Sequence, residues 1–250
     1  MKRLSNRIII IFFLTNVLFA KVVTADAKDV ELIDIVNQQT MLSQQIAKAY
    51  LCIVNKIGID DAKREMTIAL RNFKKTSKKA NSLTKSPKVI NFINRSNRFS
   101  GLSKKPFSQK SAKSILHLSE LVLGSSKSVA SLFKKGLKKD AFESISIAGQ
   151  QQMLAQRIAK YYIAYKSNIS GSKEKLIESI NLFGHNHKKL MNNRANTKTI
   201  KRKLKEIDRL WAISNKLYSG RELPKIVLDT TDDISKKMNK VTKLYIAKYK

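Results

Sequence analysis

The sequence predicts an all-α protein, built as two tandem antiparallel helical-bundle units that follow a cleaved signal peptide. Three observations carry this prediction. The 250 residues include only three prolines and eight glycines, so few positions interrupt a helix. Apolar residues recur at helical spacing and seldom alternate as they do in a strand. One stretch of helix-forming sequence also occurs twice, which indicates an internal repeat.

The first 25 residues predict a secretory signal peptide. Lys2, Arg3 and Arg7 precede a run over residues 8–20 that is apolar except for two positions, and small residues follow it. A basic start, a short apolar run and a small-residue exit are typical of an export signal, and the run is too short to span a bilayer comfortably. We expect a soluble, exported protein of the periplasm, with an uncleaved membrane anchor as the alternative.

The remaining chain divides into a first unit over residues 26–137 and a second over residues 138–250. Helices are expected where apolar residues keep a helical period between the glycine and proline breaks. In the first unit these are residues 30–56, 60–83, 89–93 and 108–133. In the second they are residues 141–166, a helix around 176–183, residues 199–217, and a last helix over 226–245 that follows a break at Ser219-Gly220 and Pro224.

The repeated stretch is the most distinctive feature of the chain. Residues 38–50, QQTMLSQQIAKAY, align with residues 150–162, QQQMLAQRIAKYY, and nine of the 13 positions are identical. On a helix, each copy forms an apolar seam interrupted by one glutamine, Gln39 or Gln151. A buried amide can fix the register of neighbouring helices, or it can bind a small polar ligand between them. Both interpretations stay open at this point.

Further amides and one guanidinium group flank the two seams. Because no carboxylate accompanies them within the repeat, they suit a polar or anionic ligand and do not suit a metal ion. The candidate ligand-binding residues are Gln150, Gln151, Gln152, Gln156, Arg157, Gln38, Gln39 and Gln44.

The second copy, together with the preceding Ala148-Gly149, resembles helix 1 of the PilJ/NarX-type sensory domain, the N-terminal domain family of type IV pilus methyl-accepting chemotaxis transducers. The resemblance implies a periplasmic helical bundle that senses a small ligand. In nitrate-sensing members an arginine stands immediately before the methionine, and here that position holds Gln152, or Thr40 in the first copy. Nitrate recognition therefore does not carry over, and the identity of the ligand stays open.

We therefore expect a stand-alone sensory module that recognises a small polar or anionic ligand and passes the signal to a membrane receptor or sensor kinase, as a monomer or a homodimer. The formal net charge of +32 also favours anionic partners. The alternative is thus a structural or adaptor protein of the cell envelope whose basic surface binds anionic polymers. Nucleic acid is a less suitable partner, because the lysines are scattered and the chain is expected to be exported.

No catalytic role, metal or cofactor is expected. His185 and His187 lie two residues apart, so a helix directs them to different faces, and no cluster of cysteines or carboxylates joins them. The sequence contains no glycine-rich phosphate loop, nucleophile elbow or pair of carboxylates in an apolar setting. The single cysteine, Cys52, predicts a small buried side chain in place of a disulfide.

Overall fold

The computed structural model describes the backbone of residues 5–102, 106–134, 137–218 and 223–249, and the side chains of these ranges from residue 27 onward, Leu102 excepted. The described chain is all-α, as the sequence predicts, and contains no strand in these ranges. Its elements are α1 (Ser5–Val54), α2 (Ile59–Leu83), α3 (Pro87–Asn97), α4 (Phe99–Leu102), α5 (Gln109–Ala130), the 3-10 turn η1 (Ser131–Lys134), α6 (Lys139–Lys166), α7 (Ser172–Met191), α8 (Lys198–Ser214) and α9 (Pro224–Tyr249).

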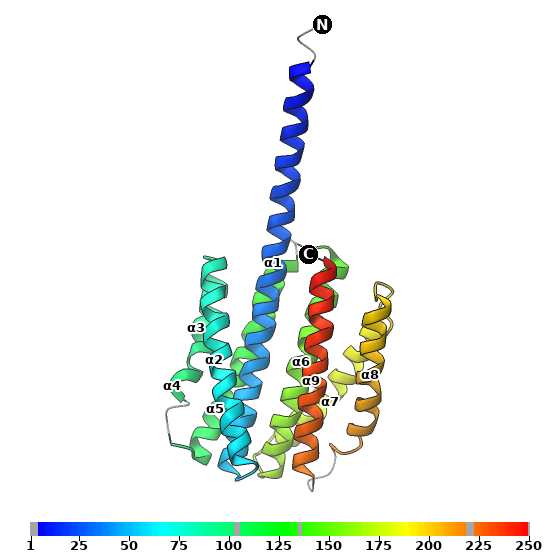
Figure 1. Cartoon of the computed structure of the whole chain (residues 1–250). Coiled ribbons are helices and arrows are strands. Elements are labelled where there is room, and N and C mark those ends of the chain that lie inside the picture. Colours follow the sequence, from blue (N-terminus) through cyan, green and yellow to red (C-terminus); the bar gives the residue numbers. More distant parts are fainter. Residues whose placement is uncertain (1–4, 103–105, 135–136, 219–222, 250) are drawn as a thin grey trace.

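The helices lie close to their expected positions, except at the N-terminus. The sequence predicts a first helix from about residue 30, whereas α1 begins at Ser5 and runs to Val54 without a break. Its N-terminal part projects beyond the bundle (Figure 1). The side chains of the expected signal peptide lie outside the described residues, as does the Ser219-Gly220 break. Within the described residues, no helix has a stretch both long and apolar enough to cross a membrane.

The turns after α1 and α6 repeat one another. Lys56 and Asn168, 112 positions apart, both adopt positive φ, at 57° and 55°. A left-handed glycine then starts each following helix, Gly58 with φ of 52° and Gly171 with φ of 72°. Glycine has no Cβ to strain this conformation, so it suits a sharp reversal between helices. The duplication therefore extends from the helix into the turn that follows it.

α1 and α6, which carry the two copies of the repeat, pack against each other in the same direction at the centre of the molecule. Asn37 donates a hydrogen bond to the carbonyl oxygen of Ile145 at 3.4 Å, and Lys160 donates to Oε1 of Gln44 at 2.5 Å. Low numbers of α1 thus meet low numbers of α6, and high numbers meet high numbers. The colours of Figure 1 show the same parallel course.

The two helices approach each other closely at Gly149. A Cβ atom there would lie 2.3 Å from Nδ2 and 2.7 Å from Cβ of Asn37, which is far inside van der Waals contact. Asn37 is the position 112 residues before Gly149, so the two copies touch at equivalent places. Glycine in the second copy makes room for the asparagine of the first.

The other helices surround this central pair. α2, α3 and α5 contact α1 or each other on one side, and α7, α8 and α9 form a matching ring with α6 on the other. The buried apolar residues nevertheless form one continuous core that includes members from both halves. A boundary between residues 137 and 138 therefore stays a prediction, although the arrangement of neighbours is the same in each half.

Candidate functional site between the two halves

The two seam glutamines anchor each central helix to the helix that follows it. Nε2 of Gln39 donates to the carbonyl oxygen of Phe73 in α2 at 3.0 Å, and Nε2 of Gln151 donates to that of Phe183 in α7 at 3.1 Å. Both side chains are fully buried. A buried amide that bonds a neighbouring backbone fixes the register of the two helices. This geometry favours the structural interpretation for these two residues.

A buried lysine of α1 lies at the centre of what we call the first charge cluster: Lys48, Glu65 and Asp232, with Gln45 and Gln156. Nζ of Lys48 lies 2.6 Å from Oε1 of Glu65 and 2.5 Å from Oδ1 of Asp232. Gln45 donates to Oε1 of Glu65 at 2.9 Å, and Gln156 donates to Oδ1 of Asp232 at 2.9 Å. The cluster therefore joins α1 and α2 of the first half to α6 and α9 of the second.

The second charge cluster comprises Lys160, Arg157, Glu120 and Glu178, with Gln44. Nζ of Lys160 lies 2.7 Å from Oε1 of Glu120 and bonds Oε1 of Gln44. The guanidinium group of Arg157 donates to Oε2 of Glu120 at 2.9 Å and lies 3.4 Å from Oε2 of Glu178. It also donates to Oγ of Ser179 at 2.9 Å. The repeat itself contains no carboxylates that could pair with these cationic and amide groups. The structure shows that carboxylates from other helices, Glu120 and Glu178, pair with Arg157 and Lys160.

The two clusters are related by the same offset of 112 positions as the repeat. Each lysine reaches out of its own half to a carboxylate on the last long helix of the other half. The equivalent pairs are Lys48 and Lys160, Gln44 and Gln156, Gln45 and Arg157, and Glu120 and Asp232. The halves therefore exchange buried ion pairs reciprocally, which gives the interface between α1 and α6 an approximate twofold symmetry.

The acidic groups of the two clusters respond differently to burial. Burial raises the pKa of Glu120, but the charge of Lys160 and the contacts with Arg157 outweigh it and lower the pKa to about 2. Burial also raises the pKa of Glu65, and there the attraction of Lys48 does not offset burial and the repulsion of Asp232. The first cluster is therefore short of positive charge relative to the second.

The lysines show the complementary pattern. Burial lowers the pKa of Lys160 to about 8, because Glu120 compensates in part while Arg157 and Lys175 add positive charge. Burial also lowers the pKa of Lys48, but Glu65 and Asp232 outweigh it, so that the net shift is upward. A lysine between two carboxylates stays charged, whereas a lysine that shares its carboxylate with an arginine is easier to deprotonate.

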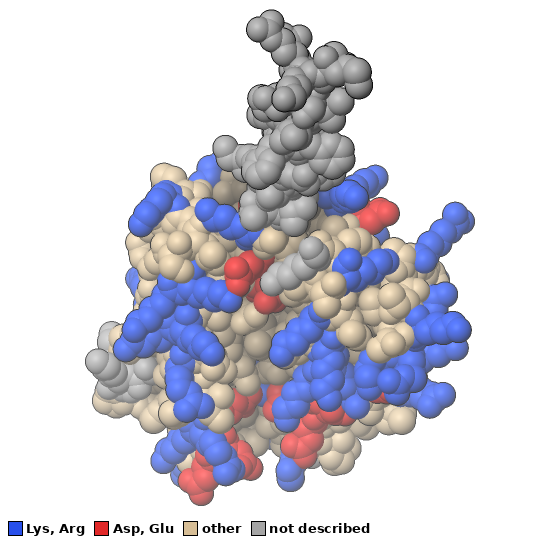
Figure 2. Space-filling model, turned by 45° about the horizontal axis from the view of Figure 1, so that its top comes forward, with Lys and Arg blue, Asp and Glu red and all other residues tan. Residues whose placement is uncertain are grey.

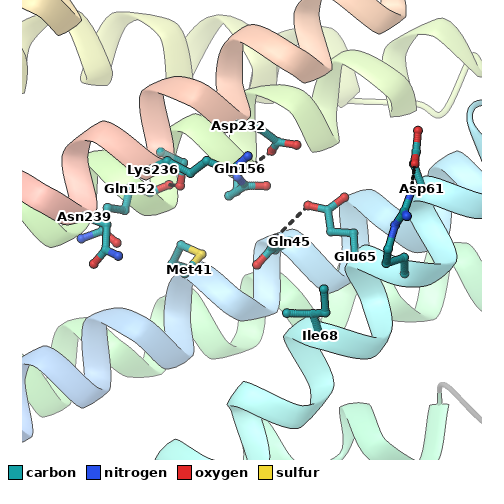
Figure 3. A pocket seen from close by; sticks show the side chains of 12 residues that line it. Met41, Gln45, Asp61, Glu65, Ile68, Gln152, Gln156, Asp232, Lys236 and Asn239 are labelled. Atoms are coloured by element: carbon teal, nitrogen blue, oxygen red, sulfur yellow. Dashed lines mark hydrogen bonds and ion pairs between the residues drawn. The ribbon is translucent and has the colours of Figure 1, made fainter.

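A cavity of about 400 Å³ opens beside the first charge cluster, between α1 and α2 on one side and α6 and α9 on the other (Figure 3). Its walls combine amides, carboxylates and a few apolar side chains. The lining residues are Met41, Gln45, Asp61, Arg64, Glu65, Ile68, Gln152, Gln156, Asp232, Ser235, Lys236 and Asn239. Concave, mixed surfaces of this size are typical of sites for small molecules.

The structure brings two of the predicted site residues to this cavity. Gln152 donates to Oγ1 of Thr242 at 2.7 Å and lines one wall. Gln156 lines another wall, is 2% exposed, and has no hydrogen-bond partner for Oε1 within the described part of the chain. Gln38 lines a neighbouring cavity of about 450 Å³ that shares Gln152 with the first.

The other predicted residues lie elsewhere. Gln150 is exposed and accepts a hydrogen bond from Asn186. Gln44 and Arg157 belong to the second charge cluster, and Gln39 and Gln151 are the seam anchors already described. The repeat thus contains residues with three different roles, which face three directions around each helix.

Sequence reasoning missed the acidic partners Glu65, Glu120 and Asp232, and it did not assign a role to Lys48 or Lys160. One signal was available: Glu120 and Asp232 are 112 positions apart, as are the two lysines. A carboxylate repeated at the period of a duplicated unit indicates a shared contact. Among the described residues, no three histidine, cysteine or acidic side chains are grouped to hold a metal ion.

Comparison with known proteins gives one match. Residues 136–243 match the family model described as "Type IV pili methyl-accepting chemotaxis transducer N-term". The matched segment begins before α6 and ends within α9, and it therefore includes the second copy of the repeat and most of the helices that surround it. No curated protein and no solved structure matches the chain.

Proposed function

Because residues 136–243 are a domain of the type IV pili methyl-accepting chemotaxis transducer N-terminal family, we propose that the protein is an exported sensory module that binds a small polar ligand in the cavity beside the first charge cluster. The family is one of sensory domains, so a ligand is its expected input. The observation that carries the proposal is Gln156, a buried residue of the matched domain that lines the cavity with an unpartnered acceptor.

A ligand in this cavity contacts both halves of the molecule. The walls come from α1, α2, α6 and α9, so binding favours one arrangement of these helices over another, provided that the ligand fits one of them better. The part of α1 that remains after cleavage near residue 26 still packs against α6, and it lies at the end of the bundle where α9 ends (Figure 1). A small shift of α1 against α6 and α9 can therefore change the surface that this end of the bundle presents to a membrane receptor or kinase.

A thermal-shift screen against small anions, amino acids and amines tests the proposal. A ligand that binds the native state at 100 times its Kd adds about 2.7 kcal/mol of stability. Asn239→Trp fills the cavity from α9 and should abolish the shift, whereas Lys240→Trp, on the exposed neighbouring position, should keep it. No stabilising compound, or equal shifts in both variants, contradicts a site in this cavity.

Export has a separate test. The protein is expressed with its own N-terminus, and the mass and location of the product are measured. Recovery from the periplasm with a new N-terminus near residue 26 agrees with the proposal. An intact N-terminus in the membrane fraction instead supports the uncleaved anchor.

A second candidate function is the binding of anionic envelope polymers, and the surface favours it. Lysine and arginine side chains cover much of the face shown in Figure 2. On α8, five basic residues surround one acid in a shallow depression: Lys198, Lys201, Arg202, Lys205 and Arg209 around Glu206. Binding of a polyanion here should weaken steeply with salt and should persist in Asn239→Trp, which separates this function from ligand binding in the cavity.

A further inference from the structure

Position 45 and its equivalent, position 157, differ in a way that changes the two charge clusters. In the second cluster, the guanidinium group of Arg157 lies between Glu120 and Glu178, 2.9 Å and 3.4 Å from their Oε2 atoms. In the first, Gln45 stands in its place and makes one hydrogen bond to Glu65 at 2.9 Å. Glutamine is shorter than arginine and carries no charge, so the first cluster lacks the guanidinium group that the second contains.

The first cluster retains the acceptors that such a group needs. Lys48 and Gln45 both bond Oε1 of Glu65, and Lys48 and Gln156 both bond Oδ1 of Asp232. Oε2 of Glu65 and Oδ2 of Asp232 accept none of the hydrogen bonds found within the described residues. Oε1 of Gln156 is likewise without a partner there. The three acceptors belong to side chains that all line the cavity.

The size of the cavity and the charges of the residues that line it support this comparison of the two clusters. The cavity of about 400 Å³ opens where Gln45 ends, and Figure 3 shows Glu65, Asp232 and Gln156 at its edge. Two carboxylates face the single buried ammonium group of Lys48. Of the other charged residues in the lining, Asp61 pairs with Arg64, and Lys236 is exposed on α9.

We propose that the cavity binds a small molecule through a guanidinium group, which occupies the place that the side chain of Arg157 fills in the second cluster. The inference depends on the proposed function and names the class of its ligand. A planar guanidinium has five donors and pairs with carboxylates in a fork geometry. Met41 and Ile68 provide apolar walls for the rest of the molecule. An anionic ligand in the same place would be repelled by the carboxylates of Glu65 and Asp232.

Calorimetric titration with methylguanidinium tests this inference. The wild-type protein should bind one equivalent. Gln45→Arg should supply the missing guanidinium from the chain itself and weaken binding about 10- to 100-fold, the loss expected when charge-assisted hydrogen bonds are blocked. Gln45→Met, which is similar in size but neutral, is the matched control and should bind within about threefold of wild type. Lys236→Ala removes a competing cation and should not weaken binding.

The second cluster provides a reciprocal measurement. Arg157→Ala should create a second site of the same kind, so that methylguanidinium raises its melting temperature more than that of the wild type and the stoichiometry rises from one towards two. Absence of methylguanidinium binding by the wild type, or equal binding by Gln45→Arg, overturns the inference. If another compound then stabilises the wild type but not Asn239→Trp, the sensory proposal stands without this ligand class. If no compound does, both proposals fail.

Discussion

The two charge clusters have the same framework but different balances of charge, since the first has one cation for two carboxylates and the second has two cations for two carboxylates. Each has a buried lysine from a central helix, a carboxylate from the other half and a second carboxylate from the following helix. Arg157 completes the second cluster, and Gln45 leaves the first incomplete. The pKa of Glu120 falls to about 2 while that of Glu65 rises. The difference at one position of the duplicated unit thus distinguishes a closed contact in the second cluster from a contact beside a cavity in the first.

The largest expected effect comes from removing the lysines. Lys48→Met leaves Glu65 and Asp232 without their shared cation and should destabilise the fold by about 3–5 kcal/mol, as for other broken buried pairs. Lys160→Met leaves Glu120 paired with Arg157, so the loss should be smaller, about 1–2 kcal/mol. Urea unfolding at pH 7 measures both. Equal losses would contradict the view that the first cluster depends on a single cation.

The acid limb of the stability curve should distinguish the two carboxylates next. The native state holds the pKa of Glu120 at about 2 against a usual value of 4.5. Its contribution, about 3 kcal/mol, is therefore complete above pH 4.5 and is lost as the pH falls towards 2. Glu120→Gln should flatten the melting-temperature profile in this window.

Glu65 should show the opposite sign in the same experiment. Its raised pKa means that the native state holds a proton more tightly than the unfolded chain does, so its contribution falls as the pH rises above 4.5. Glu65→Gln should remove that decline while leaving the limb below 4.5 in place. Identical profiles for the two variants would show that the clusters do not differ in charge balance.

A smaller effect is expected where the two copies touch. Gly149→Ala places a methyl group against Asn37 and should cost about 1–3 kcal/mol by overpacking. Gly124→Ala is the matched control, because a Cβ there meets nothing within 4 Å, so the better helix former should stabilise α5 by about 0.5–1 kcal/mol. Asn37→Gly combined with Gly149→Ala should recover much of the loss in chemical denaturation. A neutral Gly149→Ala argues against close parallel packing.

The smallest effects should come from the seam glutamines. The amide nitrogen of Gln39 bonds the carbonyl oxygen of Phe73 and the hydroxyls of Thr76 and Ser77, whereas that of Gln151 bonds the carbonyl oxygen of Phe183. Gln39→Leu should therefore cost about 2 kcal/mol and Gln151→Leu about 1 kcal/mol. Thermal unfolding of both variants gives the order, and a greater loss for Gln151→Leu would reverse the assignment.

The sequence predicts the helices well because few residues interrupt them and their apolar period is regular. It also indicates the importance of the repeat, since nine identities in 13 positions stand out in a single chain. The two copies lie on α1 and α6, which pack against each other. The sequence predicts the start of the first helix near residue 30, because the composition of residues 1–25 indicates a signal peptide. The composition of that segment predicts that it is removed after export. It does not determine where the helix begins, and α1 starts at Ser5.

The sequence singles out some of the residues around the cavity. Gln152 and Gln156, which it predicts as ligand-binding residues, line the cavity, and their role in binding stays a prediction. Arg157 is paired instead, because Glu120 and Glu178 reach it from α5 and α7. Periodicity assigns a residue to a face of its own helix, but it does not show which helix covers that face. The 112-residue spacing of Glu120 and Asp232 indicates a shared kind of contact, but only the parallel packing of α1 and α6 shows that each carboxylate pairs with a lysine of the other half.

The reciprocal exchange of ion pairs also bears on the order in which the chain folds. Lys48 and Asp232 are 184 positions apart, so this contact of Lys48 forms only after the last helix has been made. The entropic cost of closing a loop grows only slowly with its length. During synthesis from the N-terminus, however, α9 is the last helix to be made, so this contact forms late. Until α9 is made, Lys48 can pair with Glu65 of α2 but lacks its second carboxylate, Asp232. The full set of contacts of α1, the first helix made, therefore forms only when α9, the last helix made, is in contact with it.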